Sequence, residues 1–136
     1  MTQDADSLPD YRLIIEDFFE LIKIGKFKDV LQYCSPECIT HNPYVTGNMD
    51  VLTDAMIAAT KDMAGDVSEP SFSVNHIFVD GNFGVAYTQL LNSKSNPAEG
   101  GLRQVHIFHF EWDKIVEYWD ITQQITASMP NAAGAF

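Results

Sequence analysis

Three side chains able to do acid–base chemistry, those of His106, Tyr118 and Asp120, fall within one segment, residues 104–124. Side chains there alternate with a period of two on both sides of the turn residues 111–114, which predicts a β-hairpin of two long strands. Directly opposed residues in a hairpin have Cβ atoms about 5 Å apart. The pattern therefore predicts an imidazole, a phenol and a carboxylate gathered on one aromatic-lined face of a sheet.

The register of this hairpin decides which of the three residues meet. With Phe110 roughly across from Lys114, His106 lies across from Tyr118, and Asp120 is nearby. The alternation places His106, Phe108, Phe110, Val116, Tyr118 and Asp120 on this face, and Val105, Ile107, His109, Ile115, Glu117, Trp119 and Ile121 on the other.

Asp120 is the best candidate for a catalytic base. A carboxylate in an apolar cavity has its pKa raised by desolvation, toward values suited to removing a carbon-bound proton. The alternative is a carboxylate that pairs with a loop amide at the end of a strand. His106 could polarise a carbonyl or shuttle a proton, or be a core histidine satisfied by Tyr118. Tyr118 could donate to a developing enolate oxygen, or be a core aromatic with a satisfied hydroxyl.

His41 and Asn42, which precede Pro43, form a second candidate site. They could orient a substrate at the lip of a pocket, although side-chain caps of a turn produce the same pattern. His76 and His109 are expected to be structural or exposed. No two histidines have the i, i+4 spacing of a helical metal site, so we expect no metal.

Length and charge narrow the class of protein. The 136 residues suffice for one domain, and 46% hydrophobic with 20% charged residues is ordinary for a globular protein. A formal net charge of −11 disfavours nucleic acids and anionic membrane surfaces as partners, because both need a basic protein surface. No apolar run approaches the roughly 20 residues of a membrane span, and the acidic N-terminus lacks the features of a secretory signal. The expected compartment is therefore the cytoplasm, with Cys34 and Cys38 as reduced, structural thiols.

The first half of the chain predicts helices. A capping hydroxyl at Ser7 followed by Pro9 starts a helix whose apolar stripe runs to Ile24. Further helices are predicted over 26–34 and 49–63, with a turn at 35–37 and an extended piece at 38–41 between them.

After residue 70 the period changes to two. Strands are predicted over 71–79 and 84–92, joined by a turn at 80–82 after a loop at 65–70, and with the hairpin they form a four-strand meander. Helices followed by antiparallel strands indicate an α+β fold, in which a curved sheet encloses an apolar interior suited to a small molecule. In the first of these strands the residues expected to share a face are Phe72, Val74, His76 and Phe78.

The chain resembles the SnoaL-like polyketide-cyclase family in two segments, ITHNP at 39–43 with Gly47 after it and KIVEYWD at 114–120 with Gln123 after it. The tail from Pro130 to Phe136 is similar to that family as well.

The resemblance implies the cystatin-like cone fold that ketosteroid isomerases and scytalone dehydratase share. This is a curved, mostly antiparallel sheet wrapped around N-terminal helices and enclosing an apolar pocket. The similarity starts near residue 10, so we expect one domain over 10–136 after an N-terminal extension over 1–9. Phe18 and Phe108 are expected to line the pocket, both as core residues and as contacts to a hydrophobic small molecule.

The implied activity needs no cofactor. In the polyketide cyclases an acidic residue removes a proton next to a carbonyl, and an intramolecular aldol ring closure follows. Asp120 occupies the position of the terminal acid in the family's usual E-H-W-D stretch, and His41 and Asn42 match the motif near the cavity mouth. This chain departs from the family by having Tyr118 where relatives carry His, and His106 where an aspartate is common.

Two functions therefore remain open. One is a small lyase or isomerase that carries out enolisation chemistry on a hydrophobic carbonyl compound, with Asp120 as base and His106 or Tyr118 stabilising the oxyanion. The other is a non-catalytic module that binds an apolar ligand in the same cone. We also expect a homodimer formed through apolar rows on the outer face of the sheet: Val105, Ile107, Ile115 and Trp119.

Overall fold

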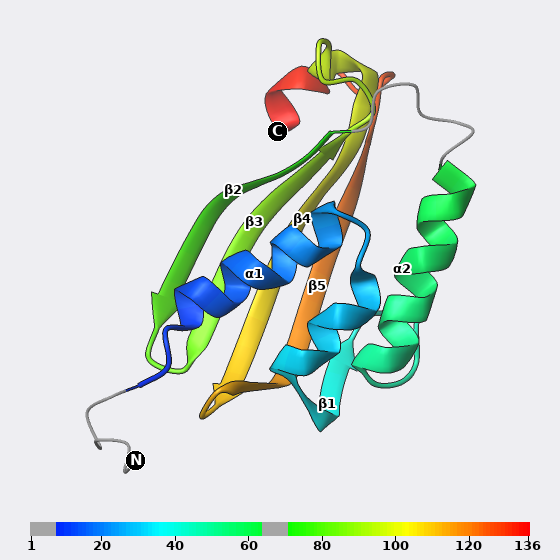
Figure 1. Ribbon diagram of the computed structural model, residues 1–136. Coiled ribbons are helices and arrows are strands. Elements are labelled where there is room, and N and C mark those ends of the chain that lie inside the picture. Colours follow the sequence, from blue (N-terminus) through cyan, green and yellow to red (C-terminus); the bar gives the residue numbers. More distant parts are fainter. Residues whose placement is uncertain (1–7, 64–70) are drawn as a thin grey trace.

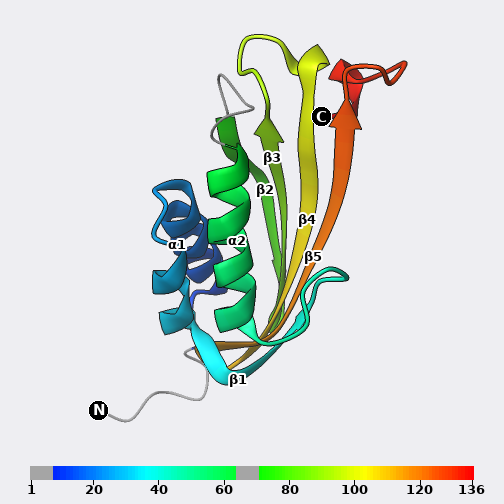
Figure 2. The same cartoon turned by 90° about the vertical axis from the view of Figure 1, so that its right-hand side faces the viewer.

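The protein has an α+β architecture in a computed structural model that describes residues 8–63 and 71–136. Its helices lie on one face of a curved five-stranded sheet (Figures 1 and 2). None of the helices in these residues is long and apolar enough to cross a membrane. The main elements are α1 (Tyr11–Lys23), the 3-10 helix η1 (Phe27–Tyr33), β1 (Cys34–His41), α2 (Met49–Met63), β2 (Ser71–Asp80), β3 (Phe83–Leu91), β4 (Gly100–Glu111) and β5 (Lys114–Thr126), with short 3-10 helices η2 (Pro97–Glu99) and η3 (Ala133–Ala135).

The predicted meander is present as β2 to β5, and one further strand completes the sheet. The strand order is β1-β5-β4-β3-β2, and β1 pairs parallel with β5. The prediction of a turn at 35–37 is therefore wrong, because those residues belong to β1, with an irregular register between Cys34 and Ile39. Proline is tolerated there because β1 is an edge strand, where one backbone N–H can be missing from the ladder.

The helices start and end close to the predicted positions. Asp10 caps α1, since its side chain accepts a hydrogen bond from the backbone N–H of Leu13. The predicted cap at Ser7, most of the N-terminal extension and the predicted loop at 65–70 lie outside the described residues. The predicted second helix is a 3-10 helix, and Cys34 already belongs to β1.

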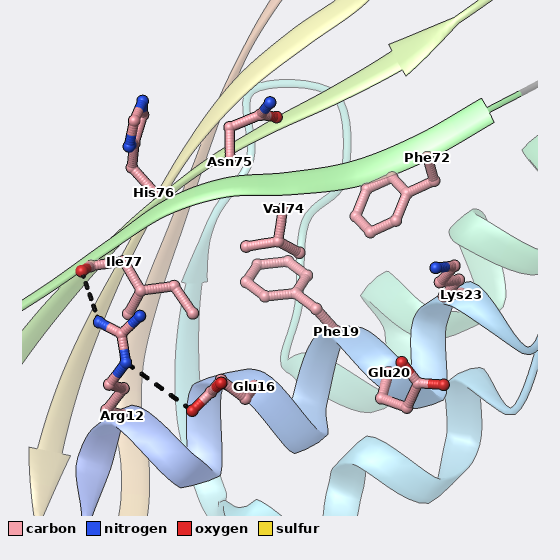
Figure 3. A pocket seen from close by; sticks show the side chains of 10 residues that line it. All are labelled: Arg12, Glu16, Phe19, Glu20, Lys23, Phe72, Val74, Asn75, His76 and Ile77. Carbon is pink, nitrogen blue, oxygen red and sulfur yellow. Dashed lines mark hydrogen bonds and ion pairs between the residues drawn. The ribbon is translucent and has the colours of Figure 1, made fainter. Parts of the chain in front are cut away.

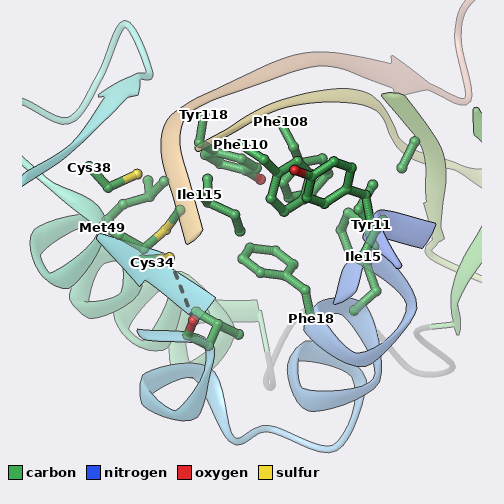
Figure 4. Packing of buried hydrophobic residues seen from close by; sticks show 14 residues of the cluster. Tyr11, Ile15, Phe18, Cys34, Cys38, Met49, Phe108, Phe110, Ile115 and Tyr118 are labelled. Atoms are coloured by element: carbon green, nitrogen blue, oxygen red, sulfur yellow. Dashed lines mark hydrogen bonds between the residues drawn. The ribbon is translucent and has the colours of Figure 1, made fainter. Parts of the chain in front are cut away.

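The core is an aromatic cluster between α1 and the concave face of the sheet (Figure 4). The ring of Phe18 packs edge-on against Phe108, with centroids 5.2 Å apart, and lies 5.7 Å from the ring of Tyr118. All three side chains are fully buried. α1 can approach β3 closely because Gly84 has no side chain, and a Cβ there would collide with Ile15. The interior predicted to be a pocket is therefore filled with side chains at this end.

The register of the β4–β5 hairpin differs from the prediction. The pairing shifts between His109 and Phe110, so that Phe110 lies opposite Ile115 and Val116 is an extra residue on β5. Such a β-bulge turns the following side chains to the other face of the sheet. At the turn Glu111, not Phe110, pairs with Lys114, and together with the bulge this sets His106 opposite Asp120. Ile115, predicted on the outer face, is fully buried in the core.

A second irregularity corrects the predicted face of β2. The register shifts between Val74 and His76, so His76 and Phe78 no longer share the face of Phe72 and Val74. Ile77 packs against the core instead, and Phe78 is 65% exposed.

The outer face of the sheet keeps three of the four residues predicted for a dimer interface. Val105, Ile107 and Trp119 are half-buried there, whereas Ile115 is in the core. Self-association stays a prediction, which light scattering at micromolar protein concentration can check.

Candidate functional site

A pocket of about 480 Å³ lies between α2, the loop after β1 and the strands β4 and β5. Its walls are mostly apolar, and among the described residues that line it there is no lysine or arginine and only one carboxylate, Asp120. Such a pocket suits a neutral, largely apolar ligand with few polar atoms. The described residues that line it are His41, Asn42, Pro43, Tyr44, Val45, Leu52, Ala55, Met56, Ala59, Leu102, Gln104, Asp120, Ile121 and Thr122.

Asp120 is held in this wall with only half of its carboxylate satisfied. Asn42 Nδ2 donates a hydrogen bond to Oδ2 at 2.8 Å, so a loop amide does pair with the acid as the alternative interpretation expected. Oδ1 is buried, and within residues 8–63 and 71–136 it is the only buried side-chain oxygen or nitrogen without a hydrogen-bond partner. Burial raises the pKa of Asp120, and the hydrogen bond from Asn42 only partly opposes this. The site therefore contains an acid that gains a proton more readily than an exposed aspartate.

Asn42 is placed to control that pKa. Its own Oδ1 accepts a hydrogen bond from the backbone N–H of Tyr44, which orients the amide so that Nδ2 is available to Asp120. Asn42 also forms an isolated bridge with Val45 that closes the loop after β1. The turn chemistry expected of this segment and its contact with the acid are thus parts of one arrangement.

Replacing Asn42 with alanine should raise the pKa of Asp120 further, because the charged form loses its one side-chain donor. The carbon NMR shift of the Asp120 carboxyl, followed against pH, measures this change directly. We also expect a loss of about 1.5–3 kcal/mol in unfolding free energy where Asp120 is ionised, and less in acid where it is protonated. Asn75→Ala, at an exposed position on β2, is the matched control and should change neither quantity. An unchanged carboxyl pKa in Asn42→Ala would contradict this account.

His106 and Tyr118 are close together but do not line the pocket. His106 Nδ1 lies 2.6 Å from the Tyr118 hydroxyl, and His106 Nε2 lies 2.8 Å from Thr88 Oγ1. Burial lowers the pKa of His106 to about 3, so the ring is neutral at physiological pH. Burial also raises the pKa of Tyr118 well above its usual value. Both polar groups are occupied by protein partners, which is the arrangement of a satisfied core histidine and tyrosine.

Three polar residues that the sequence analysis did not single out lie beside this pair. Thr88, Gln104 and Thr122 face one another across β3, β4 and β5 in direct register. Thr88 Oγ1 donates to Gln104 Oε1 at 3.3 Å, and Gln104 Nε2 donates to Thr122 Oγ1 at 3.1 Å. The alternation on β4 does place Gln104 on the face of His106, but a lone glutamine or threonine has no chemical signature of its own.

His41 is turned toward the outer face of the sheet by its ring contacts. Its imidazole stacks on Trp119, with centroids 4.6 Å apart, and Nε2 lies 2.7 Å from Glu117 Oε2. His109 contacts the other oxygen of Glu117 at 3.4 Å. The hydrogen bond with His41, the larger of the two, holds the pKa of Glu117 below its usual value. His41 thus anchors the end of β1 directly before Asn42, although it also belongs to the pocket wall.

Phe18 and Phe108, predicted as ligand contacts, are fully buried in the aromatic core and do not line the pocket. A second hollow of about 320 Å³ lies between α1 and β2 (Figure 3). Arg12 crosses one end of it, donating to the carbonyl oxygen of Ile77 and pairing with Glu16. None of the predicted site residues lines this hollow, so Asp120 and the pocket beside α2 remain the candidate site.

Neither the two cysteines nor any metal-binding group among the described residues forms a second candidate site. Cys34 and Cys38 are buried free thiols, and their Sγ atoms donate to the backbone carbonyl oxygens of Val30 and Ile39. Within the described parts of the chain, no three His, Cys, Asp or Glu side chains are arranged to hold a metal ion.

Comparison with models of known protein families identifies the family of this chain. Residues 15–118 match the family model of the SnoaL-like domain, and the chain therefore belongs to that family. No curated protein of known function is detectably similar in sequence.

Several solved structures have the same fold. AclR, a candidate hydroxylase from Streptomyces galilaeus, superposes with a TM-score of 0.66 at 12% identity over 86% of this chain and 91% of that one. An NTF2-like protein of unknown function from Cytophaga hutchinsonii gives 0.62 at 11% identity over 87% and 94%. A candidate polyketide cyclase from Sinorhizobium meliloti gives 0.59 at 14% identity over 84% and 95%. At these identities the similarity concerns the fold alone, and the expected cone fold is confirmed.

Proposed function

We propose that this SnoaL-like protein is an enzyme for cofactor-independent proton transfer on a hydrophobic carbonyl compound, with Asp120 as the base. The carboxylate takes a proton from the carbon next to the carbonyl, and the electron pair of the broken C–H bond forms the enolate. Returning the proton elsewhere gives an isomerase, and attack of the enolate on a second carbonyl gives an aldol-type ring closure. Both are forms of the acid–base chemistry that the family resemblance implies.

The observation that carries this proposal is the state of Asp120. Its pKa is raised by burial, its Oδ1 has no hydrogen-bond partner among the described residues, and it belongs to the wall of an apolar pocket. A base of raised pKa removes a carbon-bound proton more effectively than an ordinary aspartate, provided that it is ionised at the working pH. The relatives described as a candidate cyclase and a candidate hydroxylase have the same fold, which adds analogy and no more.

One observation favours the alternative, a module that binds an apolar ligand without turnover. The Tyr118 hydroxyl is hydrogen-bonded to His106, and His106 is also hydrogen-bonded to Thr88. Neither residue lines the pocket, so it lacks two of the three groups that the sequence predicted for catalysis. Turnover would then depend on Asp120 and whatever donor lies nearest to it.

Asp120→Asn separates the two functions. In heavy water, the wild-type protein should accelerate exchange of the protons next to the carbonyl of 2-tetralone, an apolar ketone small enough for the pocket. The variant should lose about 10²–10⁴-fold of that rate, the usual contribution of a positioned base. Proton NMR of the ketone measures both rates against the protein-free background. Asp113→Asn, which makes the same exchange in the exposed turn between β4 and β5, outside the pocket, should keep the wild-type rate.

The variant is expected to fold. Because the pKa of Asp120 is raised, its ionisation opposes folding, and that cost is absent in acid and appears as the pH rises through the raised pKa. Asp120→Asn should therefore be at least as stable as the wild type near neutral pH. Equal exchange rates in the two proteins would remove Asp120 from the mechanism. Binding of 2-tetralone without any acceleration by the wild type would leave the binding module.

A further inference from the structure

Gln104 is a polar side chain of the pocket that the proposed mechanism does not yet use. It stands on β4 two residues before His106, lines the pocket together with Asp120, and is half-buried. Gln104 lies opposite Thr122, and His106 lies opposite Asp120. Two neighbouring cross-strand rows on the concave face thus bring the amide and the acid to the same wall.

A chain of hydrogen bonds connects this amide to the core. It runs from the Tyr118 hydroxyl to His106 Nδ1 at 2.6 Å, from His106 Nε2 to Thr88 Oγ1 at 2.8 Å, and from Thr88 Oγ1 to Gln104 Oε1 at 3.3 Å. Tyr118, Thr88 and His106 are all buried, so water does not compete for these groups.

Which group donates in each of these hydrogen bonds follows from the buried end of the series, the Tyr118 hydroxyl. The Tyr118 hydroxyl has one hydrogen-bond partner among the described residues, His106, so it must donate or leave a buried hydroxyl hydrogen unpaired. His106 Nδ1 is then the acceptor, and because the ring is neutral its proton lies on Nε2, which donates to Thr88. Thr88 in turn donates to Gln104 Oε1. The carbonyl of Gln104 is thereby directed to Thr88, and the Nε2 amide group is the one left for the pocket.

One of the two amide hydrogens of Gln104 is used by Thr122, and the other has no protein partner among the described residues. We propose that Gln104 is a ligand-binding residue of this pocket and donates this free N–H to the carbonyl oxygen of the bound compound. Tyr118, His106 and Thr88 are positioning residues that hold the amide in that orientation. The inference rests on the proposed function for the identity of the ligand, and it assigns to Gln104 the carbonyl-binding role that the sequence suggested for His106 or Tyr118.

The ligand class follows from the two polar groups. An amide N–H recognises an acceptor oxygen, and a carboxylate two residues further along the hairpin face accepts a proton from the neighbouring carbon. No lysine or arginine is present among the described pocket residues to bind an anion. A neutral, mostly hydrocarbon ketone or related carbonyl compound meets these conditions.

The donor–acceptor order of these hydrogen bonds can be tested without a ligand. Nitrogen NMR shifts of the His106 ring in the wild-type protein should show the proton on Nε2 across the neutral pH range. A proton on Nδ1 would reverse the chain, direct Gln104 Oε1 into the pocket and overturn the inference. In Tyr118→Phe the donor to Nδ1 is lost, so we expect both tautomers to be populated.

The ligand contact is tested with two probes of the same skeleton, 2-tetralone and tetralin, which lacks the oxygen. Fluorescence or calorimetric titration should show that the wild type prefers the ketone, and Gln104→Leu should reduce that preference about 3- to 10-fold, as loss of one neutral hydrogen bond does. Gln104→Glu, which can accept from Thr88 but cannot donate to the ketone, should reduce it at least as much. Gln89→Leu, which replaces a half-buried glutamine on β3 that does not line the pocket, should leave it unchanged.

These measurements are independent of turnover. A ketone preference that depends on Gln104 supports the inference even if Asp120→Asn exchanges protons as fast as the wild type, or if the wild type does not accelerate exchange at all. If the wild type shows no preference for the ketone, or binds neither probe, or if both Gln104 variants keep the full preference, Gln104 is not a carbonyl-binding residue.

Discussion

The protein should lose stability steeply in acid because of His106. Burial lowers the pKa of this ring to about 3, so the unfolded chain takes up a proton that the folded protein excludes. The stability due to the neutral ring is fully present above the ordinary histidine pKa and is lost as the pH falls from about 6.5 toward 3. The expected slope from this residue is about 1.4 kcal/mol per pH unit, or about 4–5 kcal/mol in all, which approaches the whole stability of a small domain.

Urea unfolding at a series of pH values measures this slope. In His106→Gln, which keeps a polar group near Tyr118 and Thr88 but cannot be protonated, the slope below about pH 6.5 should fall by that amount. Asp120 contributes with the opposite sign, since its raised pKa favours folding in acid, but it is present in both proteins and cancels in the difference. His76→Gln is the matched control, because this ring is exposed on β2. Parallel curves for the wild type and His106→Gln would show that His106 is not buried as a neutral ring.

The second large effect is expected in the aromatic core. Phe108 is fully buried and packs against Phe18, Phe19 and Tyr118, with ring centroids 5.2, 5.8 and 5.2 Å away. Truncation to alanine should lower the unfolding free energy by about 3–5 kcal/mol, because it removes buried apolar surface and leaves a cavity that the neighbouring rings only partly fill. Phe78→Ala removes the same atoms from a side chain that is 65% exposed, and it should cost less than about 1 kcal/mol.

This pair of variants also addresses the role that the sequence suggested for Phe108. If Phe108 contacted a ligand in an open cone, its truncation would weaken ligand binding and leave the fold largely intact. The packing around it predicts the reverse, a large loss of stability and no direct loss of 2-tetralone affinity in the protein that remains folded. Similar unfolding curves for Phe108→Ala and Phe78→Ala would show that the core is not packed as described here.

The concave face of the sheet therefore has two structurally different parts, a closed core and an open pocket. Near Phe18 and Phe108 the sheet and α1 form a closed core, whose polar members His106 and Tyr118 satisfy each other. Toward α2 the same face opens into the pocket that contains Asp120 and Gln104. The hydrogen-bond chain through Thr88 joins the two parts, so the rigid core can orient a polar group in the pocket.

Much of this arrangement was determined by the sequence alone. Periodicity is a local property, and it located the helix at 49–63, the hairpin about residues 111–114 and the common face of His106, Tyr118 and Asp120. Short motifs in the same segments indicated the SnoaL-like family, which the family match confirms.

The tertiary structure decided what those residues do. The pairing of Glu111 with Lys114 at the turn and the bulge after His109 together set His106 opposite Asp120. The bulge also buried Ile115, because one inserted residue changes the face of those around it and nothing in the local pattern marks the insertion. The parallel pairing of β1 with β5 depends on a contact between residues far apart in the chain, which periodicity does not record. The position of the pocket depends on volume: the rings of α1 fill the cone around Phe108, whereas beside α2 the described side chains leave the space of the pocket. Which side chains fill a cavity and which line it is a property of packing among distant segments, and only the folded chain settles it.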